Sequence, residues 1–201
     1  MSPDTPGGFN VVGDDVFKQV VLARITEPTS KLDSIRVMND LGITAPSESA
    51  IYRCLRRCKD HDYRGLLSGA CWGEVAGSCP VGLLMYDVTT LWFEIHEEDE
   101  WRKPGYSKER RLEPQIIVGL LVDSHGFPLA IQAFEGNKAE TLTILPVVKA
   151  FMASHDLPRL TIVADAGMLN EANLAGRACQ VVCVSRHLDL CFHDHRATRS
   201  G

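Results

Sequence analysis

The sequence has no uninterrupted apolar segment of 18 residues, and its first ten residues, MSPDTPGGFN, contain neither a basic start nor an apolar core. A transmembrane helix needs the first feature and a secretory signal needs the second, so the sequence predicts neither. The chain also lacks a CxxC motif, and its seven cysteines are an odd number. These absences argue against a disulfide framework and predict a cytoplasmic protein with reduced thiols.

An excess of positive charge is lacking as well. The net charge of -5 over 201 residues excludes a uniformly basic coat for nucleic acid, although local basic clusters remain compatible with it. A hydrophobic content of 45% and a charged content of 23% are ordinary for a globular protein with a real core. Pairs of cysteines four residues apart (Cys54 with Cys58, Cys179 with Cys183) allow a zinc site, but we favour packed thiols.

The first part of the chain reads as helical. Residues 1–15 are rich in Gly, Pro and Asp and predict a disordered N-terminus, and residues 16–79 form a helical region. Apolar spacing and stop signals predict helices over 14–28, 30–43, 47–60 and 63–76.

The third of these helices is basic on one side. Its apolar residues recur at helical spacing, and the other side carries Arg53, Arg56, Arg57 and Lys59. Two helices joined by a short turn, the second of them basic, are typical of a helix-turn-helix that binds DNA. A plain helical hairpin with solvated arginines is the alternative.

After residue 80 the pattern changes to β. Strands are predicted over 83–95, 115–123, 128–136, 160–165 and 180–186, with helices over 139–155 and 166–178. The SHGF segment at 124–127 closes a hairpin, and Pro146 kinks its helix or marks where the regular part begins. This order predicts an α/β or α+β fold.

Two acids end apolar segments in this region. Asp87 lies within LLMYDVTTLWF, a strand that reads as buried, and Asp165 closes LTIVAD. If the two strands are neighbours, the carboxylates project together and repel each other. A divalent cation removes that repulsion, and oxygen ligands suit Mg²⁺ or Mn²⁺ in a two-metal site for phosphodiester chemistry. For each acid alone, capping of the next turn is the alternative.

A basic segment follows the Asp87 strand. WRKPGYSKERR contains Arg102, Lys103, Lys108, Arg110 and Arg111, with Trp101 and Tyr106 as stacking surfaces. We expect phosphate contacts here, and the preceding EEDE to face solvent or pair with these cations. Lys138, after the turn residues Gly136 and Asn137, adds a further phosphate contact.

Several motifs together carry a family resemblance. YDVTTLWFE, WRKPGYSKERR, PQIIVGLLVDSHGFPLAIQAFEGNKAET and IVADAGMLNEANL are similar to segments of the DDE-type transposases of bacterial insertion sequences, over about residues 20 to 186. The resemblance implies an RNase H-like catalytic core over residues 80–186, a mixed sheet flanked by helices, with an all-α DNA-binding region before it. It makes Asp87 and Asp165 the first two metal-binding acids of the triad. It also implies DNA as partner, both transposon ends and target, at the nucleoid, and leaves a homodimer open.

The third acid of that triad, a Glu on a later helix, has no counterpart here. Residues 187–201, HLDLCFHDHRATRSG, do not resemble the family and read as an aberrant tail. The resemblance therefore predicts an inactive truncated copy of a transposase. Glu135 is a candidate surrogate ligand, whereas Glu140 is better explained as a first-turn helix charge. A DNA-binding fragment that interferes with a full-length enzyme, and a nuclease that only hydrolyses, are the competing functions.

Overall fold

The computed structural model describes residues 8–76, 83–94, 97–105, 113–165, 168 and 179–184. The chain divides into two compact units, Met1–Glu74 and Val75–Gly201. Each unit is described separately below. The predicted domain boundary at residue 79, the tail at 187–201 and all but Met168 of the helix predicted over 166–178 lie outside the described residues.

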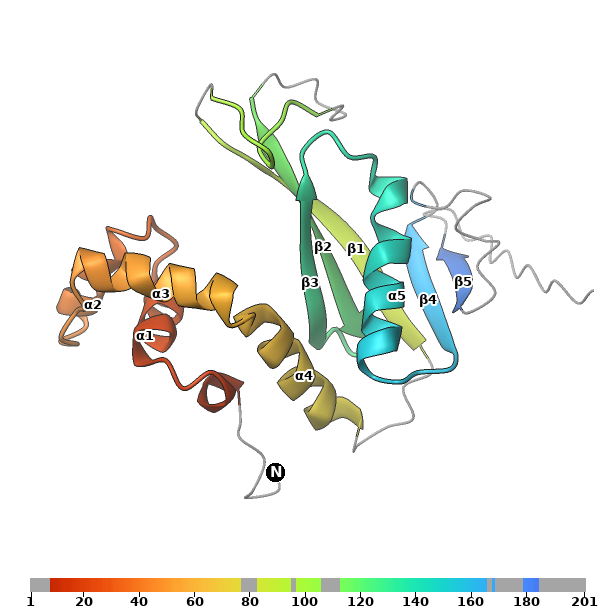
Figure 1. Ribbon diagram of the computed structural model, residues 1–201, viewed down its shortest axis with the longest axis horizontal. Coiled ribbons are helices and arrows are strands. Elements are labelled where there is room, and N and C mark those ends of the chain that lie inside the picture. The colour runs from red at the N-terminus through yellow and green to blue at the C-terminus, as the bar shows by residue number, and fades with distance from the viewer. Residues whose placement is uncertain are drawn as a thin grey trace, which may run out of the picture. The chain divides into compact units, whose positions relative to one another are not determined.

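The first unit is helical (Figure 1). Its elements are one 3₁₀ helix and four α-helices: η1 (Gly8–Val11), α1 (Asp15–Thr26), α2 (Ser34–Asp40), α3 (Glu48–Asp60) and α4 (Tyr63–Ala76). α2 is shorter than the segment predicted over 30–43. Ser30 begins a turn in which its hydroxyl accepts the Asp33 amide, and Gly42, with a φ of 71°, takes the left-handed conformation that ends helices.

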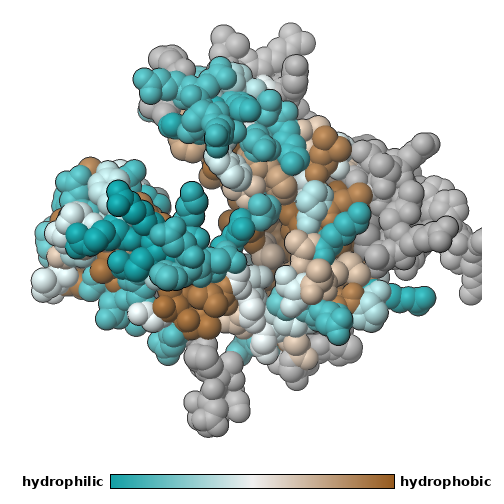
Figure 2. Space-filling view, in the orientation of Figure 1, coloured by the Kyte–Doolittle hydropathy of each residue, from teal (hydrophilic) through white to brown (hydrophobic). Residues whose placement is uncertain are grey.

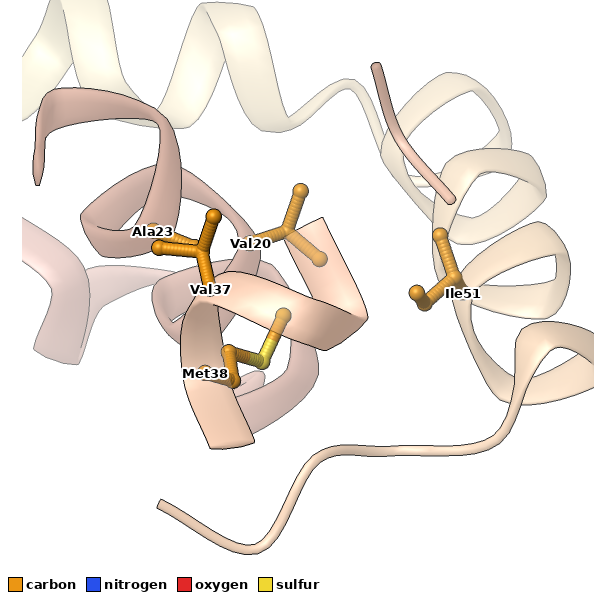
Figure 3. Close-up of a cluster of buried hydrophobic side chains, with 5 residues drawn as sticks. All are labelled: Val20, Ala23, Val37, Met38 and Ile51. Atoms are coloured by element: carbon orange, nitrogen blue, oxygen red, sulfur yellow. The ribbon is translucent and has the colours of Figure 1, made fainter. Parts of the chain in front are cut away.

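Three of these helices share one core (Figure 3). Val20 and Ala23 of α1, Val37 and Met38 of α2, and Ile51 of α3 are each exposed by 9% or less. Fully burying an aliphatic side chain of this size contributes roughly 1.5–3 kcal/mol. Because Ile51 faces this core, the opposite side of α3 faces outward. Three of the four α-helices thus form the core of this unit, and two of them, α2 and α3, are the helices predicted for the helix-turn-helix.

Asp14 shows that part of the predicted disordered N-terminus is ordered. Its Oδ1 accepts the backbone N–H groups of Val16 and Phe17, at 3.1 and 3.2 Å, and so caps α1. Its Oδ2 accepts Nε of Arg57 at 2.8 Å and the hydroxyl of Tyr63 at 2.9 Å. Residues 8–15, which belong to the segment 1–15 for which the sequence predicts disorder, thus include η1 and the cap of α1.

The second unit contains a five-stranded sheet in the order β3-β2-β1-β4-β5. Its strands are β1 (Leu83–Trp92), β2 (Gln115–Asp123), β3 (Pro128–Glu135), β4 (Leu160–Asp165) and β5 (Cys179–Val184). The first three pair antiparallel, whereas β4 runs parallel to both β1 and β5. The predicted fold class, an α/β mixed sheet preceded by an all-α region, is confirmed.

One face of the sheet is covered by α5 (Ile144–Ser154), which follows η2 (Glu140–Leu142) and contacts β2 and β3 (Figure 1). Several strand residues that alternate toward this side are fully buried, among them Leu84, Leu121 and Ile162. Pro146 lies in the first turn of α5, where backbone N–H groups have no partner within the helix, so the missing N–H of proline costs no hydrogen bond. It thus marks the start of the regular helix.

The other face of the sheet is open in the described part of this unit. Leu91 of β1, Leu120 of β2 and Ile131 of β3 alternate toward it and are exposed by 48%, 38% and 49%. Among the described helices of this unit, only α5 packs on the sheet. Residues of β1 and β4 that point away from α5 are therefore accessible.

Candidate metal and DNA site

Asp87 and Asp165 lie on neighbouring parallel strands, each two residues beyond the last paired residue. β1 and β4 pair in parallel, with Leu84 opposite Ile162 and Met85 opposite Val163. The pairing ends at Met85 and Val163, and Asp87 and Asp165 each lie two residues further along their strands. Neighbouring strands lie about 4.8 Å apart, so where the strands keep that spacing the two carboxylates are close enough to hold one cation between them.

Both carboxylates project to the open face. In β1 and in β4 the residues that precede these acids, Tyr86 and Ala164, are buried toward α5, and the acids themselves are exposed. The expectation that Asp87 sits in a buried strand is wrong, because only one face of β1 is covered. Asp87 also does not end its strand, since β1 continues to Trp92 along β2.

Tyr86, the residue before Asp87 in the YDVTT motif, has a packing role. Its side chain crosses Gly119 of β2, where an added Cβ would lie 2.1 Å from the Tyr86 hydroxyl oxygen. Burial raises the pKa of this phenol. The missing side chain of Gly119 thereby leaves room for the Tyr86 ring on the buried face of the sheet.

No third ligand joins the two acids in the part of the chain that the structure describes, where no group of three His, Cys, Asp or Glu residues could hold a metal. Glu135, the candidate surrogate, lies opposite Ile116 of β2, and Ile116 lies opposite Leu91 of β1. It is two strands away from Asp87 and four residues further along, a separation of about 16 Å between Cα atoms. Glu135 also pairs with Lys138 at 3.9 Å. It is therefore too distant to complete this site.

The segment after β1 folds around Asp99. Its Oδ1 accepts the N–H groups of Trp101 and Arg102, at 2.8 and 2.6 Å, and its Oδ2 accepts Nε of Arg102 at 2.8 Å. These hydrogen bonds, first among them those from the two backbone amides, lower the pKa of Asp99. The expectation that the EEDE acids face solvent or pair with the cations is confirmed, since Glu97, Glu98 and Glu100 are exposed.

Gln115 fastens this segment to the sheet. Its backbone exchanges two hydrogen bonds with Lys103, at 3.0 and 3.2 Å, and its Nε2 donates to the carbonyl of Gly136 at 2.8 Å. The N–H of Gly136 donates to the carbonyl of Trp101 at 2.9 Å. A Cβ on Gly136 would lie 2.0 Å from the Gln115 carbonyl oxygen. The close approach of three backbones explains why glycine occupies the EGNK turn.

These contacts bring three of the predicted DNA-contacting residues to one end of the sheet. Arg102 and Lys103 lie beyond the end of β1, and Lys138 lies beyond the end of β3 (Figure 1). The described part of the segment, 97–105, contains four acids and only these two cations. The other predicted contacts, Lys108, Arg110 and Arg111, lie outside the described residues, as does the stacking residue Tyr106.

The three arginines predicted to contact DNA from α3 differ in their surroundings. Arg53 and Arg56 are exposed, and Arg53 donates one hydrogen bond of 3.3 Å to Ser49. Arg57 instead forms an ion pair of 2.7 Å with Asp14, whose side chain is only 7% exposed. The structure therefore gives Arg57 an intramolecular role that the sequence analysis missed.

Asp14 and Gln115 are the two polar residues whose importance was not predicted. Asp14 had a recognisable signal, an acid immediately before an apolar-periodic segment, but its glycine-rich surroundings obscured it. Gln115 had none, because its partners lie 12 and 21 residues away in the sequence.

The cysteines on α3 behave as packed thiols. Cys54 is buried and free, and burial, together with the nearby Cys58, raises its pKa to about 12. Zinc ligands must be deprotonated, and the described residues contain no group of three metal-ligating side chains. The described helices also include none long and apolar enough to cross a membrane.

No protein-family model matches the chain, and no curated protein matches it. Among solved structures, it is similar to a piggyBac transposase synaptic complex with hairpin DNA, with 15% identity over 92% of this chain and a TM-score of 0.41. It is also similar to a Mos1 transposase paired-end complex with left transposon end (9% identity over 82%, TM-score 0.29) and to a Mos1 mariner paired-end complex with Mn (8% over 90%, TM-score 0.29). The chain spans 39%, 57% and 60% of those chains.

Proposed function

We propose that this chain is part of a DDE-type DNA transposase of the insertion-sequence kind, with Asp87 and Asp165 as two metal-binding catalytic acids. The observation that carries the proposal is the parallel pairing of β1 and β4, whose last paired residues, Met85 and Val163, each lie two residues before one of these exposed acids. The motif resemblance of residues 20 to 186 supports the same assignment.

The donor set suits a hard divalent cation. Two exposed carboxylates side by side offer oxygen ligands only, which Mg²⁺ and Mn²⁺ prefer, and leave room for water and phosphate oxygens. When bound, a pair of such ions supplies activation of a hydroxyl nucleophile and stabilisation of the leaving oxygen in phosphodiester cleavage and strand transfer. In this proposal the Asp87 and Asp165 carboxylates hold and orient the ions, and the two strands carry these side chains.

DNA is the partner that the remaining features fit. The helical unit offers the exposed arginines of α3, and the second unit offers Lys103 and Lys138 at the end of the sheet toward which β1 runs. In this proposal the helical unit binds transposon ends, and the cations of residues 101–111 and Lys138 bind phosphates near the cleavage site. The protein acts on DNA in the cytoplasm, at the nucleoid, alone or as a homodimer.

We further propose that this chain binds DNA without cleaving it. A two-metal site of this kind needs a third carboxylate, and Glu135 is about 16 Å from Asp87 by strand geometry. A non-catalytic DNA-binding fragment that interferes with a full-length enzyme is the alternative form of the proposal.

The test is an assay of supercoiled plasmid DNA with Mn²⁺ and the full chain. We expect salt-sensitive binding and no nicking. The contrary result is that the wild type nicks the plasmid, with the nicking abolished in Asp87→Ala and retained in Asp156→Asn, on the turn after α5. That result would keep the transposase assignment and overturn the proposal that this chain does not cleave DNA. Capture of a joined transposon end would then separate a transposase from a nuclease that only hydrolyses. Absence of both DNA binding and Asp87-dependent nicking would overturn the proposal.

A further inference from the structure

We infer that the outward face of α3 reads DNA sequence through Ser49, Tyr52, Arg53 and Arg56, and that Arg57 takes no part in base recognition. The inference rests on the proposed DNA binding of this chain and specifies which side chains make it selective.

The four residues form one stripe. They occupy positions i, i+3, i+4 and i+7 of α3, which lie on the same side of a helix, and all four are exposed. Ile51 and Cys54 occupy the opposite side, exposed by 0% and 2%, and Ile51 belongs to the core of Figure 3. Ser47 caps the helix at its beginning by accepting the Ala50 N–H. The stripe is thus held on a helix whose rotation is fixed by its packing.

The charge of this stripe is positive and uncompensated within it. No acidic residue occurs between Ser49 and Arg56. Arg36 on α2 shows the contrasting case, because Glu27, Asp33 and Asp40 all pair with its guanidinium. In the space-filling view, hydrophilic side chains gather over α3 (Figure 2).

Arg57 lies off this stripe, and its guanidinium forms an ion pair within the helical unit. Two of its nitrogens, Nε at 2.8 Å and a terminal guanidinium nitrogen at 2.7 Å, contact Oδ2 of Asp14. The same oxygen accepts the Tyr63 hydroxyl. Releasing this guanidinium toward DNA would leave the nearly buried Asp14 carboxylate short of its cation, which is costly. Arg57 is therefore a positioning residue that ties α3 to the start of α1.

The stripe has the dimensions and chemistry for the major groove. From Ser49 to Arg56 it extends about 10 Å along the helix axis, and the groove is wide enough to admit an α-helix. Arg53 and Arg56 can each donate two hydrogen bonds to the edge of a guanine, and Ser49 can contact several bases. Lys31, whose Nζ lies 5.5 Å from the Tyr52 ring centroid, places a cation beside the stripe for a phosphate.

The experiment selects duplexes from a pool of randomised DNA with the full chain. The wild type should enrich a sequence motif and bind it in a salt-sensitive manner. Arg53→Lys and Arg56→Lys keep the charge but lose the planar fork. They should bind the enriched duplex roughly ten- to a hundredfold more weakly and lose selection at one base position each, while binding to random DNA is unchanged.

Three further variants give the controls. Lys31→Ala should lower the slope of affinity against salt by about one while the enriched motif stays the same. Arg64→Lys, at an exposed arginine of α4, should change neither. Arg57→Lys should lower the melting temperature and leave the motif unchanged. Thermal unfolding of the stripe variants should match the wild type, because their side chains are exposed.

The outcomes separate this inference from the proposed function. If Arg53→Lys and Arg56→Lys enrich the wild-type motif at wild-type affinity, or if Arg57→Lys alone changes the motif, the inference is overturned. Salt-sensitive binding without any enriched motif overturns the inference and leaves the proposed DNA binding standing. Failure of the wild type to bind DNA overturns both.

Discussion

Asp87 of β1 and Asp165 of β4 each lie two residues beyond Met85 and Val163, the last paired residues of two neighbouring parallel strands, on a sheet face that the described helices of their unit leave open. Nothing in the hydrophobic core requires an acid at either position, because both side chains point away from it. Carboxylates that come close together repel each other, and a divalent cation that binds both removes this repulsion.

Removing one of these acids should have opposite effects with and without metal. In metal-free buffer Asp87→Asn should raise the melting temperature slightly, because it removes the repulsion. With Mn²⁺ at a hundred times its dissociation constant, the wild type should gain about 2.7 kcal/mol of unfolding free energy, and the variant should lose that gain. Differential scanning fluorimetry with and without Mn²⁺ measures both.

The matched control for this pair is Asp156→Asn. Asp156 has a φ of 50°, a conformation that Asn also adopts, and it lies on the turn after α5. The Asp156→Asn variant should keep the full gain in unfolding free energy that Mn²⁺ gives the wild type. Equal losses in Asp87→Asn and Asp156→Asn would show that the metal binds the surface non-specifically.

Asp14→Ala should destabilise the helical unit by about 2–4 kcal/mol, because it removes both the cap of α1 and the partner of Arg57. Urea denaturation followed by circular dichroism at 222 nm, the standard helix wavelength, is the measurement. Asp15→Ala removes an exposed acid from the next position and should cost far less. A similar loss in both variants would contradict the role assigned to the Asp14 hydrogen bonds.

Acid should weaken the helical unit through the same residue. Burial by itself raises the pKa of Asp14, but the hydrogen bonds from Arg57, the Phe17 amide and Tyr63 together outweigh it, and the net pKa is lowered. Stability from this carboxylate is therefore fully present above the unfolded pKa of about 3.9 and is lost as the pH falls through the lower folded value. Urea midpoints measured from neutral pH down to acid should fall less steeply for Asp14→Asn than for the wild type.

Glycines in the two units should respond oppositely to alanine. Gly136→Ala forces a Cβ to within 2.4 Å of the Lys103 carbonyl oxygen, so it should release residues 97–105 from the sheet and increase their hydrogen exchange. Gly69 of α4 has no atom within 4 Å of an added Cβ. Gly69→Ala should therefore stabilise the helix by about 0.5–1 kcal/mol. Unchanged exchange of residues 97–105 in Gly136→Ala would show that this turn does not hold the segment.

Local sequence was sufficient for the bounds of several elements that the structure describes. β2, β4 and α4 begin and end where their patterns of apolar residues and turn signals predicted, because periodicity and stop residues act over a few neighbours. The position of α3 followed in the same way, from the spacing of Ile51 and Cys54. The identity of the two candidate metal ligands also came from sequence, since an acid within apolar β-formers is costly unless it has a purpose.

The tertiary structure decided everything that depends on distant partners. It placed β4 beside β1 and in parallel, so that Asp87 and Asp165 lie on neighbouring strands, whereas Glu135 lies two strands away from Asp87. It covered one face of β1 only, so Asp87 is exposed where the apolar run suggested burial. It also paired Arg57 with Asp14, 43 residues earlier in the chain. Side-chain type is local information, whereas which groups meet is set by strand order and by packing between elements far apart in the sequence.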